Sequence, residues 1–161
     1  MRTIGRRQAV RLFAALIGSN AVSARLPAAI PAEKAVYRGG TLSYFEPPAE
    51  GRLFTNLPSE LVFMAAQERL AVPYGAVNSL EYGQKAGRRL GLAIAVSPLF
   101  LLSKKRRHYL TIGFLDEAGE QQAAVFELGK RIVRSTLAAL EAKTGLLVEF
   151  EDEKARQAAR R

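Results

Sequence analysis

The chain has 161 residues, no cysteine, one histidine and a formal net charge of +9. A hydrophobic content of 48% and a charged content of 24% exclude a disordered chain and an integral membrane protein, and the length predicts one domain. Without cysteine there are no disulfides, thiolate metal sites or cysteine nucleophiles to consider.

The positive charge is concentrated in two parts of the chain. Residues 1–25 carry five arginines and no acid, and residues 85–107 carry seven lysines or arginines and no acid. These two parts together contribute +12, so the rest of the chain sums to −3. Bulk charge therefore gives no support to nucleic-acid binding, and only the middle block offers a basis for it.

Residues 1–24 have the features of a targeting segment. An arginine-rich start precedes a short apolar run, Leu12–Gly18, and Val22-Ser23-Ala24 has the small-residue pattern that signal peptidase recognises. We therefore predict a signal peptide and an exported, periplasmic or envelope-associated protein. The alternative is an amphipathic amino-terminal helix that stays on a cytoplasmic protein. Residues 25–34, which include Pro27 and Pro31, are predicted to be a linker.

The first half of the domain is strand-like. Hydrophobic alternation and turn residues predict a first strand over residues 35–45, with a bulge or bend at Gly39-Gly40. Further strands are expected over residues 52–55, 61–66, 69–72 and 74–84.

The middle of the chain is predicted to form a hairpin. Gln84–Gly87 resembles a tight turn, and Leu92, Ile94 and Val96 mark the core face of a return strand. If this strand pairs antiparallel with the strand expected at 108–115, the two basic clusters of the block lie at opposite ends of the sheet. About 30 Å would then separate them.

A second hairpin and a helix follow. Asp116–Gly119 predicts a tight turn leading into a strand over residues 121–128. A helical period then links five apolar residues and ends before Gly145. These residues are Leu128, Ile132, Val133, Leu137 and Leu140. Residues 146–150 are expected to form a short terminal strand, and residues 151–161 a charged, frayed helical tail.

The order of these elements predicts a mainly β protein of the α+β class. About seven antiparallel strands would form a small barrel or sandwich over residues 35–150, and one carboxy-terminal helix would cap its open end or edge.

The same order resembles the bacterial pleckstrin-homology-like, or GRAM-like, domains. The resemblance rests on the segment Leu70–Tyr82, LAVPYGAVNSLEY, and on His108–Ile112 and Val125–Leu128 followed by the helix. It covers Val36 to Gly145. The resemblance implies a binding or docking module and not an enzyme, although a fold alone does not decide function.

The acid-free block supplies the candidate ligand-binding residues. A surface normally mixes charges of both signs, so a long stretch of one sign points to an anionic partner such as lipid head groups or an acidic protein. The candidates are Lys85, Arg88, Arg89, Lys104, Lys105, Arg106 and Arg107. The alternative is an ordinary solvated hairpin tip and loop. A structural protein-interaction domain also stays open, while nucleic-acid binding ranks behind both.

Apolar and aromatic residues near the block have two interpretations each. Pro98–Leu102 would either insert into a membrane beside the basic residues or pack on the helix. Tyr74, Tyr82 and Tyr109 would either stack on bases or sugars or be half-buried strand residues.

His108, the single histidine, is expected to have a structural or surface role. No spacing links it to a nucleophile and an orienting carboxylate, and one histidine without cysteine does not make a metal set. We therefore predict no enzymatic activity, no cofactor and no metal.

Overall fold

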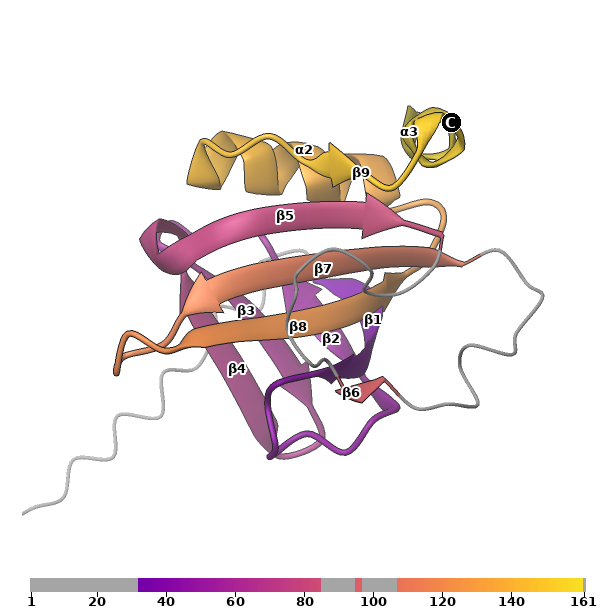
Figure 1. The fold of residues 1–161 in the computed structure, drawn as a ribbon. Coiled ribbons are helices and arrows are strands. Elements are labelled where there is room, and N and C mark those ends of the chain that lie inside the picture. Colours follow the sequence, from indigo (N-terminus) through magenta and orange to yellow (C-terminus); the bar gives the residue numbers. More distant parts are fainter. Residues whose placement is uncertain (1–31, 85–94, 97–106, 161) are drawn as a thin grey trace, which may run out of the picture.

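The computed structural model describes residues 32–84, 95–96 and 107–160. Within these residues the chain forms a curved sheet, and two helices from the carboxy-terminal part of the chain lie beside β5 and β9 (Figure 1). In chain order the elements are β1 (Glu33–Gly40), β2 (Ala49–Phe54), β3 (Glu60–Ala65), β4 (Glu68–Pro73), the short 3₁₀ helix η1 (Tyr74–Ala76), β5 (Val77–Gly83), β6 (Ala95–Val96), β7 (His108–Leu115), β8 (Gln121–Leu128), α2 (Val133–Thr144), β9 (Glu149–Phe150) and α3 (Glu153–Arg160).

The sheet is one continuous layer of eight strands in the order β4-β3-β2-β1-β8-β7-β5-β9, with β6 paired to β1. A four-strand meander, β1 to β4, joins a three-strand meander, β5-β7-β8, through the antiparallel pair of β1 and β8. The mainly β, α+β class is therefore confirmed. The finer prediction of about seven antiparallel strands and one capping helix was wrong, because the described sheet has nine strands, β9 pairs parallel to β5, and the expected frayed tail forms a second helix packed on the core.

The expected bulge in the first strand is confirmed, but it lies at Arg38, directly before Gly39-Gly40. The register of β1 against β8 shifts between Tyr37 and Gly39. A Cβ built on Gly40, whose φ is +152°, would lie 2.1 Å from the carbonyl oxygen of Ala123. Glycine is therefore required for the close approach of these two strands.

The predicted return strand was assigned to the wrong neighbour. β7 has β5 on one side and β8 on the other, so both of its edges are occupied. Ala95-Val96 pairs instead with Gly40 and Gly39 of β1. Alternation in a sequence indicates that a strand forms, but the partner is chosen by long-range packing. The described residues do not include Leu92, Ile94 or residues 85–87 of the expected Gln84–Gly87 turn.

The second predicted hairpin is confirmed. The amide of Asp116 donates to the Glu120 carbonyl at 3.0 Å, and Gly119 takes the positive φ of +80° that the turn requires. The Asp116 carboxylate accepts the amides of Ala118 and Glu120 at 3.0 and 2.9 Å. These bonds, with the side-chain amide of Gln122, lower the pKa of Asp116 below its ordinary value, so this turn carries a fixed negative charge.

The core lies on the concave side of the sheet and is rich in aromatic residues. The ring centroids of Phe63 and Phe126 are 4.9 Å apart, and those of Tyr37 and Phe45 are 5.0 Å apart. These residues come from β1, β3, β8 and the connection between β1 and β2, so one cluster ties both meanders together.

The helices close this core. α2 buries Val133, Leu137 and Leu140, and it ends at Gly145, whose φ is +74°. The helical period was extended too far at its start, since Leu128 belongs to β8.

The predicted terminal strand and tail helix both form, as β9 and α3. Ala155 and Ala159 of α3 are buried against the core, so the folded unit extends past residue 150.

Candidate functional site

Three chain connections meet at one end of the sheet, which we call the His108 end. Gly83 at the end of β5 pairs with Tyr109 of β7, and His108 pairs with Leu128 at the end of β8. The end of β5, the start of β7 and the β8–α2 connection therefore lie side by side, as Figure 1 shows. The chain leaves this end after Gln84 and returns to it at Arg107.

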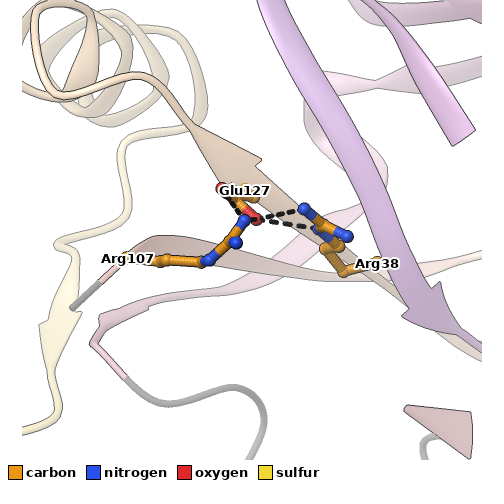
Figure 2. Close-up of polar contacts among 3 residues, drawn as sticks. All are labelled: Arg38, Arg107 and Glu127. Carbon is orange, nitrogen blue, oxygen red and sulfur yellow. Dashed lines mark hydrogen bonds and ion pairs between the residues drawn. The ribbon is translucent and has the colours of Figure 1, made fainter. Parts of the chain in front are cut away.

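An ionic cluster ties the His108 end to the middle of the sheet (Figure 2). The Glu127 carboxylate lies 2.6 Å from Nη1 of Arg107 and 2.7 Å from Nη2 of Arg38. The three residues come from β8, from the residue before β7, and from β1, and the Arg38 and Glu127 side chains are only 16% and 18% exposed. Two guanidinium groups share one carboxylate, so the cluster keeps a net positive charge.

A tyrosine–histidine pair lies beside this cluster. The Tyr82 hydroxyl is 2.5 Å from Nδ1 of His108, and the two rings stack with their centroids 6.1 Å apart. Burial raises the pKa of Tyr82 to about 12, so its hydroxyl stays protonated. Burial, and then the nearby charge of Lys130, lower the pKa of His108, while Glu127 opposes this shift. In the neutral tautomer with its proton on Nε2, His108 accepts a hydrogen bond from the Tyr82 hydroxyl at Nδ1.

This arrangement is suited to holding strands together. Among the described residues, no carboxylate hydrogen-bonds to the His108 ring, so the geometry of an activated nucleophile is not assembled in that part of the chain. The described residues also contain no group of three or more His, Cys, Asp or Glu side chains placed to hold a metal ion.

The tyrosines considered as stacking platforms are buried. Tyr74, Tyr82 and Tyr109 are 5%, 1% and 5% exposed, so their faces are not available to bases or sugars. Tyr74 donates its hydroxyl to the Thr55 carbonyl at 2.7 Å. Burial is the main cause that raises the pKa of Tyr74 and of Tyr109 to about 12. Tyr82 and Tyr109 are therefore strand residues that are more deeply buried than expected, and Tyr74 is buried in η1 and not in a strand.

One of the seven predicted ligand-binding residues, Arg107, falls in the described part of the chain, where it pairs with Glu127. The other six lie outside the described residues, as does Pro98–Leu102. These six are Lys85, Arg88, Arg89, Lys104, Lys105 and Arg106. The strand pairing does place both flanks of the block, Gln84 and Arg107, at the same end of the sheet. The separation expected between the two clusters themselves falls on residues outside the described part of the chain.

Sequence reasoning missed three basic residues of this region. Lys130 and Arg131 are exposed in the connection between β8 and α2, and Arg38 enters the cluster from β1. The available signal was Glu127, a charged residue in the strand Val125-Phe126-Glu127-Leu128. A glutamate on the outward face of a strand is stabilised by an oppositely charged side chain on a neighbouring strand, so Glu127 predicted a basic partner.

No family model and no curated protein matches the chain. No helix among residues 32–84, 95–96 and 107–160 has both the length and the apolar character needed to cross a membrane.

Proposed function

We propose that the protein is a non-enzymatic docking module that binds an anionic membrane surface through the His108 end. The observation that carries the proposal is the pairing of β5 with β7. This pairing puts the two flanks of the acid-free block, Gln84 and Arg107, on neighbouring strands at one end of the sheet.

Chain connectivity adds the basic residues to this end. Lys85 follows Gln84 directly and Arg106 precedes Arg107 directly, and consecutive Cα atoms are about 3.8 Å apart. The six basic residues of 85–106 are thus tethered to an end that already holds Arg107, Lys130 and Arg131. Of the acids described there, Glu127 pairs with Arg107, Glu151 accepts the Gln84 amide, and Asp152 and Glu153 are exposed just after β9.

The physical effect of such a concentration is well defined. Basic residues close to an anionic bilayer each contribute about 1 kcal/mol of attraction, and several together produce stable but salt-sensitive binding. Lipid head groups are favoured over nucleic acid because the rest of the chain sums to a negative charge and its strand tyrosines are buried.

We also propose that the fold is pleckstrin-homology-like. Support comes from the four-strand meander β1–β4, the three-strand meander β5-β7-β8 and the helix α2 that directly follows it. The added β9 and α3 depart from that plan. A docking role agrees with the proposal, but the charge at the His108 end carries the functional argument independently of the fold.

Co-sedimentation with vesicles tests the function. We expect the full chain to bind phosphatidylcholine vesicles that contain phosphatidylglycerol, and not phosphatidylcholine alone. Lys104→Glu combined with Lys105→Glu should weaken binding by at least about tenfold, from the loss of about 1 kcal/mol per charge. The matched control is Arg69→Glu combined with Lys143→Glu, two exposed residues on β4 and at the end of α2.

Equal binding to both vesicle types at low salt would overturn the proposal. Retention of an acidic protein in a pull-down, with no vesicle binding and with sensitivity to the same charge reversal, would assign the His108 end to a protein partner instead.

A further inference from the structure

The end of the sheet opposite His108 contains two adjoining hollows that share Tyr44, and we call them together the groove. The larger hollow has a volume of about 540 Å³ and lies between β4 and the hairpin that joins β7 to β8. The smaller one, of about 420 Å³, lies between the β1–β2 connection and the β3–β4 turn. Two large hydrophobic side chains that line the groove, Tyr44 and Leu115, are 47% and 44% exposed.

The groove follows an open edge of the sheet. β4 is the terminal strand of the sheet, and Leu70, Ala71 and Pro73 of this strand line the larger hollow. The two-residue turn between β3 and β4 makes Ala65 and Glu68 a hydrogen-bonded pair. Hydrogen-bonded pairs alternate in an antiparallel ladder, so the backbone groups of Arg69 and Ala71 point away from β3, toward the open edge.

A backbone hydrogen bond beyond β4 fixes this alternation. The Tyr74 amide donates to the Ser59 carbonyl at 3.0 Å. Tyr74 and Ser59 are therefore a hydrogen-bonded pair, as the alternation that starts at Ala65 and Glu68 requires. Pro73, which has no amide hydrogen, pairs with Glu60 at a non-hydrogen-bonded position. The open edge of β4 therefore offers the amide and carbonyl groups of two residues to an added strand.

The charge of the groove is opposite to that of the whole chain. Among the described residues, its lining includes five carboxylates and no lysine or arginine, although the chain has a net charge of +9. The carboxylates belong to Glu46, Glu50, Glu68, Asp116 and Glu117. Burial first, and then the negative charge of Glu68, raise the pKa of Tyr44. The Glu68 carboxylate is therefore close enough to the Tyr44 hydroxyl to affect it electrostatically.

We propose that the groove binds an extended cationic polypeptide segment, in which arginine or lysine alternates with apolar residues, as an added strand on β4. Backbone groups of Arg69 and Ala71 would pair with the segment, and its apolar side chains would contact Tyr44 and Leu115. Its cationic side chains would lie against the carboxylate rim. This is strand addition, in which main-chain bonds provide affinity and alternate side chains provide specificity.

Charge complementarity selects this occupant. A second copy paired edge to edge through β4 would bring two acidic rims together, which is unfavourable. The chain itself contains a cationic segment, since residues 1–25 carry five arginines and no acid, although these arginines do not alternate with apolar residues. The proposal concerns the end opposite His108 and does not rest on the proposed membrane docking.

The test measures fluorescence anisotropy of a labelled peptide with four Arg-Val repeats, added to the full-length protein at low salt. We expect saturable binding of this peptide and none of the matching Glu-Val peptide. Glu68→Gln combined with Glu117→Gln should weaken binding by about tenfold, since exposed charge pairs each contribute modestly. Glu149→Gln combined with Glu153→Gln, two exposed acids outside the groove, should leave it unchanged.

Backbone pairing is tested separately from charge. The Arg-Val peptide methylated at alternate backbone nitrogens keeps its charge but loses the hydrogen bonds of one edge, so it should bind at least tenfold more weakly. This comparison uses the unaltered protein and therefore does not depend on the folding of any variant. Equal binding of the methylated peptide, or no effect of the Glu68/Glu117 changes, would overturn the proposal.

Competition by the cationic amino-terminal segment is tested with one further variant. If that segment occupies the groove, a variant in which Arg2, Arg6, Arg7 and Arg11 are changed to glutamine would bind the Arg-Val peptide more tightly than the unaltered chain, which supports the same chemistry of recognition. Absence of Arg-Val binding in both proteins would overturn the proposal.

Discussion

The two ends of the sheet differ in how their charged side chains are arranged. At the His108 end, Arg38 and Arg107 share the carboxylate of Glu127, and exposed Lys130 and Arg131 lie beside them. At the groove end the described lining residues include five carboxylates and no lysine or arginine. The first end is held by an ion-paired cluster between strands, whereas the second is hollow and bordered by an open strand edge. The net charge of +9 therefore does not describe either end of the sheet, because the two ends are chemically distinct.

The largest expected effect tests what shapes the groove end. Gly40→Ala would place a Cβ 2.1 Å from the Ala123 carbonyl oxygen at a φ of +152°, so we expect a loss of about 3–5 kcal/mol in the free energy of unfolding. Gly75→Ala is the matched control, because nothing lies within 4 Å of the Cβ that it would add, and it should change stability by less than about 1 kcal/mol. Urea denaturation measures both. Similar losses in the two variants would contradict the close approach of β1 and β8.

The next effect tests what holds the His108 end. Glu127→Ala would leave two partly buried guanidinium groups without their shared carboxylate, and we expect a loss of about 2–3 kcal/mol. Glu60→Ala removes the partner of Arg69 in an exposed pair and should cost less than about 1 kcal/mol. If the two variants were equally stable in urea, the cluster would have no special role at this end.

The smallest effect is a pH dependence confined to the His108 end. The pKa of His108 is lowered in the folded protein, so the unfolded chain binds a proton more readily and stability falls as the pH drops from 7 to 5. The chain has one histidine, so His108→Gln should flatten the melting temperature across this range. Parallel pH profiles for the two proteins would contradict the assigned environment.

Local pattern predicted much of this fold. Alternation placed most of β1 to β5, β7 and β8, and glycine positions predicted the bulge beside Gly39-Gly40 and the turn before Gly119. Each of these features depends on residues that are neighbours in the chain. Strand partners do not, and this is why the return strand was given the wrong neighbour and the parallel pair of β9 with β5 was not foreseen.

The same limit applied to the sites. The acid-free block was visible in sequence, but its two flanks came together only through the β5–β7 pair. The groove draws its carboxylates from separate connections and from the start of β2 and β4, so no local run of residues indicated it. The signal peptide and the export of the protein stay predictions.

The most direct test of the account asks which end of the sheet meets a membrane. Because the chain has no cysteine, single cysteines at Arg131 and Glu117 can each carry an environment-sensitive fluorophore, one at the His108 end and one at the groove. On addition of phosphatidylglycerol-containing vesicles, we predict a blue shift and a rise in emission from the label at residue 131 and no change at residue 117. A change at residue 117 without one at residue 131, or equal changes at both, would contradict docking through the His108 end.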